Sequence, residues 1–274
     1  MTTISARSHP TVARFRETRD GRDETSLFIE GRRLLEEFLD SPLIPREAAV
    51  TPTVAADART VPLLEALRER GAPVHLVAPS VMDFLSDLET PPGIAVRAER
   101  PAPLDMASLF ALGSPTPFIV LLDALQSPAN VGAILRSAEA GGASAVGVRP
   151  GTADPLSPKA LRASAGSAFR MPLFRCESVP SLAAMFPTPP TVVVADAAGS
   201  RSYNEWDWRI PCILLLGGET RGVTEESFGS LPAQRIKIPM AGRVESLNVA
   251  VAAGILLIEA RRQRSQGKEE TATA

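Results

Sequence analysis

The chain has few of the residues on which many enzyme sites depend. Its 274 residues include two histidines, His9 and His75, and two cysteines, Cys176 and Cys212. Both histidines lie in the first third of the chain, so a site in the remainder must work without imidazole. Two well-separated cysteines fit a reducing cytosol and support neither a disulfide framework nor a zinc cluster. We therefore expect no metal site.

Long apolar runs are also missing. The longest, residues 249–258, is far shorter than the roughly 18 residues that a membrane span needs. The first ten residues contain no apolar segment of the kind found in secretory signals. We expect a cytoplasmic protein that does not bind membranes. The net charge of −2 argues against a strongly basic nucleic-acid binder, but a local basic face can act within a neutral total.

Three common α/β ligand motifs are absent as well. The chain contains no G-x-G-x-x-G, no G-x-x-x-x-G-K-[ST] and no G-x-S-x-G. These absences argue against the usual dinucleotide fingerprint, a P-loop and a hydrolase nucleophile elbow.

The sequence does contain a regular alternation of strand-like and helix-like segments. Residues 118–123, 191–196 and 212–217 are continuous apolar runs, which are typical of buried parallel strands. A helix is expected at about residues 129–140, ended by two glycines. This alternation predicts an α/β fold with a mostly parallel sheet covered on both faces.

The pattern also predicts a division of the chain. Residues 101–115 are rich in Pro, Ala and Ser and are expected to form a linker between a smaller α/β domain at 1–100 and a larger one at 116–265. The polar residues 266–274 are expected to be a disordered tail.

Polar clusters stand out in the larger domain. Asn130 and Arg136 follow the first apolar strand, and the Gly-Gly-Glu of residues 217–219 ends another. Ser246 and Asn248 precede the apolar run at 249–258. Taken singly, each has a plain interpretation: Asn130 or Ser246 as a helix cap, Arg136 as a solvated residue, Glu219 as an exposed acid in a turn. A cap at Ser246 leaves Asn248 unexplained, because Asn is a poor residue inside a helix.

Together the clusters resemble the SpoU branch of the SPOUT superfamily, also called the TrmH family. Residues 130–138 match its N-x-G-x-x-x-R-x-A motif, 217–222 its G-x-E-x-x-G motif, and 238–248 its I-P-M-x-x-x-x-x-S-L-N motif. The resemblance covers roughly residues 115–264. One departure is Gly218, where many members have Asn.

The resemblance implies an S-adenosylmethionine-dependent RNA 2′-O-methyltransferase. It implies a deep trefoil knot in the larger domain, a homodimer in which the helix at 249–258 is buried, and an N-terminal substrate-binding domain similar to the ribosomal L30e fold. The implied catalytic residues are Arg136, Asn130, Glu219, Ser246 and Asn248. The implied cofactor-binding residues are Leu216, Gly217, Gly218, Glu219, Ile238, Met240, Ser246 and Leu247. Within this set, Glu219 is expected to orient Asn248.

Two basic segments are candidates for RNA binding. Their residues are Arg14, Arg16, Arg32 and Arg33 near the N-terminus, and Lys159, Arg162, Ser164 and Arg170. Acidic residues dilute the first segment, so a merely solvated surface is the competing interpretation.

The favoured substrate is structured RNA, 23S ribosomal RNA ahead of tRNA, because an additional N-terminal domain suits a structured ribosomal target. A non-catalytic RNA-binding or ribosome-assembly factor with the same fold is the alternative from another class. The residues leave open the nucleotide that is modified, and a housekeeping or antibiotic-resistance role.

Overall fold

The computed structural model describes residues 3–105, 108–109, 117–218 and 222–272, and the chain divides into two compact units. Unit 1 comprises Met1–Ala102 together with Leu156–Arg170, and unit 2 comprises Pro103–Pro155 and Met171–Ala274. The short excursion at Leu156–Arg170 was not anticipated in the predicted division at residues 101–115.

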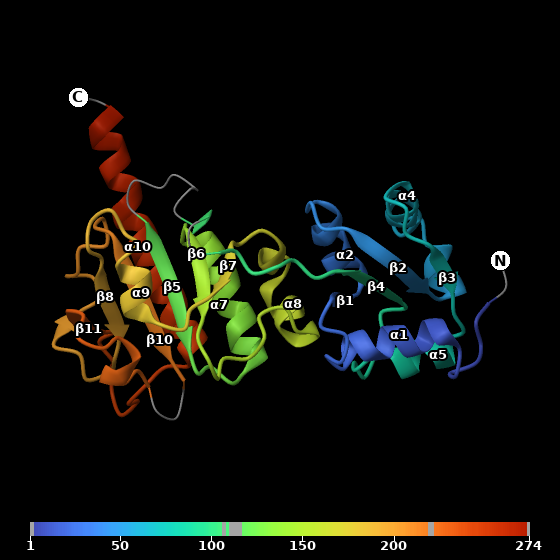
Figure 1. Cartoon of the computed structure of the whole chain (residues 1–274), viewed down its shortest axis with the longest axis horizontal. Coiled ribbons are helices and arrows are strands. Elements are labelled where there is room, and N and C mark those ends of the chain that lie inside the picture. The colour runs from blue at the N-terminus through green and yellow to red at the C-terminus, as the bar shows by residue number, and fades with distance from the viewer. Residues whose placement is uncertain (1–2, 106–107, 110–116, 219–221, 273–274) are drawn as a thin grey trace. The chain divides into compact units, whose positions relative to one another are not determined.

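Unit 1 is a four-stranded sheet with helices on both faces (Figure 1). Its elements are α1 (Pro10–Arg19), β1 (Ser26–Glu30), α2 (Arg32–Leu39), β2 (Pro45–Val50), α3 (Pro52–Ala55), α4 (Val61–Glu69), β3 (Val74–Leu76), α5 (Pro79–Leu85), β4 (Ile94–Glu99), α8 (Pro158–Ser164) and the 3-10 helix η1 (Ser167–Phe169). The strand order is β1-β4-β2-β3, and only the β2–β3 pair is parallel. Apolar residues of α1 and α5 form a core on one face, and α8 packs against β1.

Unit 2 is a seven-stranded sheet of order β7-β6-β5-β10-β8-β11-β9, in which every strand pair is parallel. Its elements are β5 (Phe118–Asp123), α7 (Pro128–Ala140), β6 (Ala145–Val148), β7 (Leu173–Arg175), α9 (Val179–Ala183), β8 (Thr191–Ala195), β9 (Arg201–Ser202), β10 (Cys212–Gly217), the 3-10 helix η2 (Glu225–Ser227), β11 (Ala233–Lys237) and α10 (Val249–Ala272). The predicted α/β class with a mostly parallel sheet is confirmed, because the apolar runs form its central strands.

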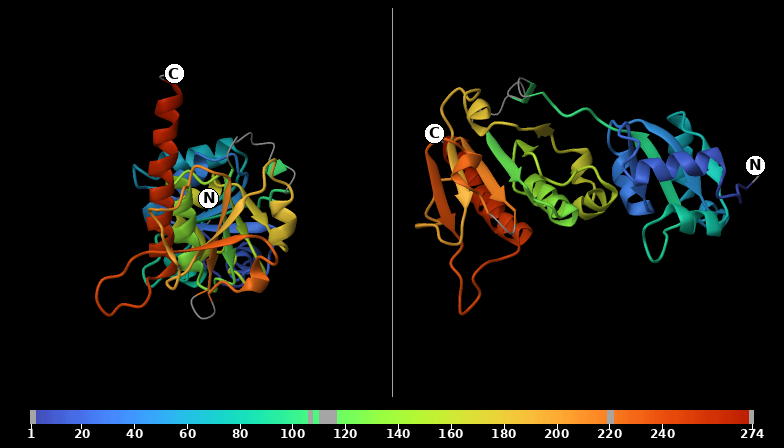
Figure 2. Two further views of the ribbon diagram at one scale, coloured as in Figure 1. Left: turned by 90° about the vertical axis from the view of Figure 1, so that its left-hand side faces the viewer. Right: turned by 60° about the horizontal axis from the view of Figure 1, so that its bottom comes forward.

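Two helices, α7 and α10, lie side by side in unit 2 (Figure 2). Small residues allow this close approach: a Cβ added at Gly141 would come within 2.8 Å of the Leu257 Cβ. On the opposite face, α9 packs against alternate residues of β5, β8 and β10. The sheet is therefore covered on both faces, as predicted.

The helix α10 is longer than predicted, and its first part exposes apolar side chains that the prediction places in a homodimer interface. Its first part is not buried all round, because Val251 and Ile258 are 52% and 55% exposed while Leu256 and Leu257 are buried. It also continues to Ala272, into the segment predicted to be a disordered tail. Lys, Glu and Ala in that segment are good helix formers, so the polar composition does not oppose a helix.

Candidate functional site

The N-termini of α7 and α10 meet through two asparagine side chains. Asn248 Nδ2 donates a hydrogen bond to Asn130 Oδ1 at 3.2 Å. Asn248 Oδ1 in turn accepts from the backbone N–H of Ala250 at 2.9 Å and of Val251 at 3.4 Å. One asparagine therefore caps α10 and joins residues that are 118 positions apart in the sequence.

This geometry corrects the predicted caps. Ser246 is exposed in the loop before α10, and Asn248 is the residue that caps the helix. The cap of α7 is Ser127, whose Oγ accepts from the backbone N–H of Asn130 at 3.4 Å, so Asn130 is not itself a cap. Asn and Ser cap helices about equally well, so the sequence did not decide between positions 246 and 248.

A tight glycine turn follows β10 at the carboxyl edge of the sheet. Gly218 N–H donates to Asp123 O, and Gly222 N–H donates to Gly218 O, both at 2.9 Å. A Cβ added at Gly217 would lie 2.3 Å from the Gly222 carbonyl carbon. No side chain fits there, so glycine is required. The predicted role of Glu219 in orienting Asn248 falls outside the described residues.

The other predicted cofactor residues lie directly before this turn and in the segment before α10, and they differ in exposure. Leu216 is 1% exposed, so its side chain belongs to the core of unit 2. Ile238, Met240 and Leu247 are half-buried. The segment between β11 and α10 contains these three residues and projects from unit 2, drawn in orange-red in Figure 2.

Arg136 is exposed on α7. Its guanidinium forms no hydrogen bond or ion pair with any residue that the structure describes. Six residues separate it from Asn130, about 9 Å along the helix axis at a rise of about 1.5 Å per residue. The structure therefore joins Asn130 to Asn248 but does not bring Arg136 into contact with that pair.

The candidate RNA-binding residues of unit 1 fall into two groups. Most are already engaged: Arg14 forms a bidentate pair with Glu47 at 2.8 Å, Arg16 stacks 4.3 Å from the Phe84 ring centroid, Arg32 lies 3.7 Å from Asp57, Arg162 lies 3.6 Å from Glu30, and Arg170 pairs with Glu37 at 2.5 Å. Arg33 and Lys159 are exposed and form no such pair with any described residue. These two are the basic residues of the set that are available to a ligand.

The prediction for Ser164 was wrong. Its side chain is fully buried, and its Oγ donates to Leu161 O at 2.8 Å. The sequence did not show this because α8 packs against β1, which lies far away in the chain.

Sequence reasoning also missed a buried ion network in unit 1. Arg97, 7% exposed, contacts Glu47 and Asp23, and Glu47 also binds Arg14. Burial raises the pKa of Glu47, but hydrogen bonds from Arg14 and Arg97 outweigh it and hold the pKa below its ordinary value. No local pattern marks these partners, because they come from α1, the segment after it, β2 and β4.

The two cysteines are buried and free. Burial raises the pKa of both thiols to about 11, so neither provides a thiolate near neutral pH. In the described part of the chain, no group of three or more His, Cys, Asp or Glu side chains is placed to hold a metal ion. Among the same residues no helix is long and apolar enough to cross a membrane.

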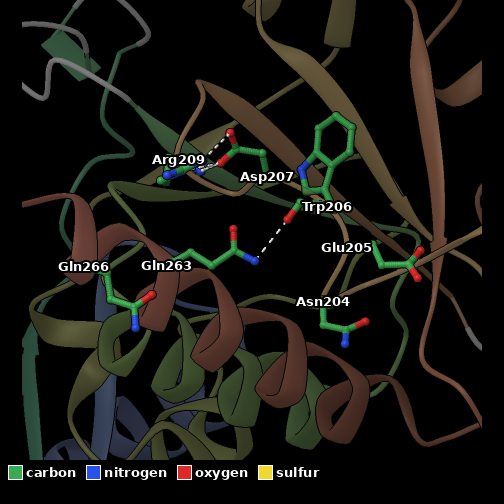
Figure 3. Close-up of a pocket in the computed structure, with 7 residues that line it drawn as sticks. All are labelled: Asn204, Glu205, Trp206, Asp207, Arg209, Gln263 and Gln266. Atoms are coloured by element: carbon green, nitrogen blue, oxygen red, sulfur yellow. Dashed lines mark hydrogen bonds and ion pairs between the residues drawn. The ribbon is translucent and has the colours of Figure 1, made fainter.

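A pocket of about 310 Å³ opens elsewhere in unit 2, between the segment before β10 and the later part of α10 (Figure 3). Its lining residues are Asn204, Glu205, Trp206, Asp207, Arg209, Gln263 and Gln266. Gln263 closes one side by donating to Trp206 O at 3.1 Å. No residue predicted to bind cofactor or RNA lines it, so it is separate from the candidate site.

Two family models match the chain. Residues 117–258 match the SpoU rRNA Methylase family, and residues 28–104 match the RNA 2′-O ribose methyltransferase substrate-binding domain. The chain therefore belongs to the SpoU rRNA methylase family.

Similar proteins extend over most of its length. It is 31% identical over 268 residues to an uncharacterised tRNA/rRNA methyltransferase from Synechocystis, covering 95% of this chain and 94% of that relative. It is 34% identical over 217 residues to the 23S rRNA (guanosine-2′-O-)-methyltransferase RlmB of Salmonella typhi, covering 76% and 87%. The structure also resembles that of the SpoU methyltransferase AviRb from Streptomyces viridochromogenes in complex with AdoMet. The TM-score is 0.82 at 28% identity, over 94% of this chain and 98% of that one.

Proposed function

We propose that this protein is an S-adenosylmethionine-dependent methyltransferase that modifies a ribose 2′-OH of structured RNA, with 23S ribosomal RNA as the favoured substrate. The observation that carries the proposal is the Asn130–Asn248 junction, which joins the first and third family motifs within unit 2. The relatives named above support both the reaction and the RNA. The RNA substrate implies that the protein acts in the cytoplasm.

The glycine turn fits a cofactor that is recognised through backbone groups. The space beside Gly217 and Gly218 admits no Cβ, so the chain there presents peptide groups instead of side chains. Leu216 and Gly217, with Ile238, Met240 and Leu247 from the loop before α10, would hold the adenosine part. When bound, S-adenosylmethionine supplies an electrophilic sulfonium methyl group. Glu219 and Ser246 are the remaining cofactor-binding residues that the family resemblance implies.

The 2′-OH is a weak nucleophile, so the protein must position it and stabilise the charge that develops on O2′. Arg136 suits the second task, because its guanidinium remains charged and presents several donors. Its exposure and its lack of a carboxylate partner among the described residues leave it available for the RNA phosphate next to the target ribose. A guanidinium is a poor general base, so we assign it stabilisation of charge.

Unit 1 would bind the RNA. Arg33 on α2 and Lys159 on α8 both belong to it and retain free cationic groups among the described residues. The RNA contact would thus combine a helix of the N-terminal segment with a helix that lies within the range of the methylase family model.

A homodimer is part of the proposal. Val251 and Ile258 are seven residues apart, so they lie on one face of α10, and both are more than half exposed. Apolar side chains at this spacing suit a helix that packs against a second copy. Asn130 and Arg136 do not reach each other within one chain, so a site that uses both residues would draw on two subunits. The family resemblance also implies a deep trefoil knot in unit 2, and we propose the knot on that resemblance.

Titration calorimetry with S-adenosylmethionine and with its demethylated product tests this proposal. We expect about one cofactor molecule bound per chain. If neither compound binds, the enzyme assignment is contradicted and the non-catalytic RNA-binding alternative is favoured. If the cofactor binds, a methyl-transfer assay with ribosomal RNA and with tRNA identifies the substrate, and transfer to tRNA alone would replace 23S ribosomal RNA with tRNA.

A further inference from the structure

A buried polar cluster lies beside the glycine turn and has no place in the chemistry described above. Asp123 ends β5, Arg149 follows β6, and Ser227 ends η2. The side chains of Asp123 and Arg149 are 13% and 14% exposed, and Ser227 is 8% exposed. Three segments that are distant in the sequence thus place polar groups together at the carboxyl edge of the sheet.

The Asp123 carboxylate connects the cluster. Its Oδ1 lies 3.0 Å from Arg149 Nε, and its Oδ2 accepts a hydrogen bond from Ser227 Oγ at 2.5 Å. The Arg149 guanidinium also donates to the backbone carbonyl of Ser227. Each of the three residues contacts the other two, so removal of one leaves buried polar groups without partners.

The backbone of the same aspartate holds the start of the glycine turn. Asp123 pairs with Gly217 in the β5–β10 ladder, and its carbonyl accepts from Gly218 N–H. The next residue, Ala124, has φ +54°, and its carbonyl oxygen would lie 2.6 Å from a Cβ at Gly218. A non-glycine residue in this left-handed region indicates a backbone that its surroundings determine closely.

The end of the turn is held by the side chain of the aspartate. Val223 and Phe228 pack in the core of unit 2, and Ser227, between them, bonds to the Asp123 carboxylate. Residue 123 therefore holds the chain on both sides of the turn, through its carbonyl at Gly218 and through its carboxylate at Ser227. Gly217, Gly218 and Gly222 have much conformational entropy to lose, so such restraints favour one conformation of these glycines.

We propose that Asp123, with Arg149 and Ser227, is a positioning residue that keeps Gly217, Gly218 and Gly222 in the conformation that accepts S-adenosylmethionine. This inference rests on the proposed cofactor site. It concerns affinity for the cofactor, because glycines that are held in place before binding cost less to order on binding. The three residues touch no reacting atom.

The test uses the full-length chain. Ser227→Ala removes the hydroxyl and should weaken S-adenosylmethionine binding by about five- to tenfold, the size expected for one hydrogen bond to a charged group. Asp123→Asn should weaken it by at least the same factor. In both variants the KM for the cofactor should rise, while kcat at saturating cofactor stays within about threefold. Ser227→Thr keeps a hydroxyl and should restore binding.

Ile213→Val is the matched control for stability. Ile213 is fully buried at the second position of β10, four residues before Gly217, so this variant should lower Tm without changing cofactor affinity more than about twofold. If it weakened binding as much as Ser227→Ala, the effect would be one of general stability and the inference would fail.

Hydrogen exchange without cofactor separates this inference from the proposed function. The Gly218 and Gly222 amides are hydrogen-bonded, and Ser227→Ala should speed their exchange by about tenfold, with little change in the middle of β10. Unchanged exchange and unchanged affinity in a wild type that binds S-adenosylmethionine would overturn the positioning role alone. A wild type that binds no cofactor would overturn the proposed function instead.

Discussion

The ion network of unit 1 and Arg136 of unit 2 use arginine in opposite ways. In unit 1, Arg14 and Arg97 converge on Glu47, and Arg19 pairs with Asp20. In unit 2, Arg136 stands exposed without a carboxylate among the described residues. The arginine-rich N-terminal sequence suggests an RNA-binding face, but the structure shows that much of its charge stabilises unit 1 internally. A basic residue is available to RNA only when no carboxylate within the protein engages it.

The largest functional effect is expected for Arg136. Arg136→Ala should reduce methyl transfer at least about 100-fold, on the order of 3 kcal/mol, because one preorganised donor to the developing charge is lost. Arg136→Lys should restore little, since an ammonium does not reproduce a bidentate grip. Single-turnover methylation at saturating RNA and cofactor measures this, with calorimetry showing cofactor affinity within about twofold of wild type. Turnover close to wild type in Arg136→Ala would make this arginine a plain surface residue.

Substitution of Glu47 is the corresponding test in unit 1, and it should change the stability of that unit. Glu47→Gln leaves the buried Arg97 with Asp23 as its remaining carboxylate partner and should lower the free energy of unfolding of unit 1 by about 3 kcal/mol. Hydrogen exchange of the β2 and β4 amides measures the effect. Fluorescence of Trp206 and Trp208, both in unit 2, should change little. Equal loss in both units would contradict a network confined to unit 1.

The same network predicts a pH dependence. The pKa values of Glu47 and Asp23 are both held below their ordinary range, although burial opposes this at each group. A carboxyl group with a lowered folded-state pKa stabilises the fold above its ordinary pKa, and that stability is lost as the pH falls towards the folded-state value. Unit 1 should therefore lose stability as the pH falls below about 4.5, the ordinary value for Glu. Hydrogen exchange measured stepwise from neutral to acidic pH checks this, and Glu47→Gln should show a shallower decline.

Variants at Asn248 distinguish its role as the cap of α10 from its hydrogen bond to Asn130, which joins the first and third motifs. Asn248→Ala should lose about 1 kcal/mol at the start of α10 together with the bond to Asn130. Asn248→Asp keeps an oxygen that accepts from the first-turn N–H groups and adds a charge that favours a helix N-terminus, but it has no N–H for Asn130. Amide exchange in α10 should therefore recover in Asn248→Asp while methyl transfer does not. Full recovery of both would reduce Asn248 to a cap.

The smallest effects are expected for the RNA-facing cations of unit 1. Arg33→Ala and Lys159→Ala should each weaken RNA binding by a few-fold and reduce the salt slope of log K by about one. Arg14→Ala should leave that slope unchanged, because its charge is paired with Glu47. RNA titrations at several salt concentrations measure both quantities. Equal salt slopes for all three variants and the wild type would mean that the RNA does not contact Arg33 or Lys159.

The sequence predicted the core of unit 2 well but misplaced the cap of α10 and an RNA contact at Ser164, for physical reasons. The strands at 118–123 and 212–217 are recognisable because a strand buried on both faces is apolar at every position. Ser246 was mistaken for the cap because Ser and Asn have equal capping preference two residues apart. The excursion at Leu156–Arg170 was missed because an apolar helix face shows that it needs a partner without showing which one.

The long-range polar contacts could not be predicted from the sequence for a related reason. Glu47 and Arg97 read as ordinary alternating strand residues until β2 and β4 are paired. Asp123, Arg149 and Ser227 belong to three connections whose meeting is set by the strand order. The family motifs did identify Asn130 and Asn248, and the structure adds the hydrogen bond that joins them.

The central claim is that this chain methylates RNA at a ribose 2′-oxygen. The most direct measurement incubates the purified wild type with labelled S-adenosylmethionine and ribosomal RNA from cells that lack the gene, and then locates the modified nucleotide. We predict incorporation at one position of 23S ribosomal RNA, with resistance to alkaline cleavage at the labelled nucleotide because its 2′-OH is blocked. A protein that binds cofactor and RNA but transfers no methyl group, or that transfers it to a base, would contradict the account.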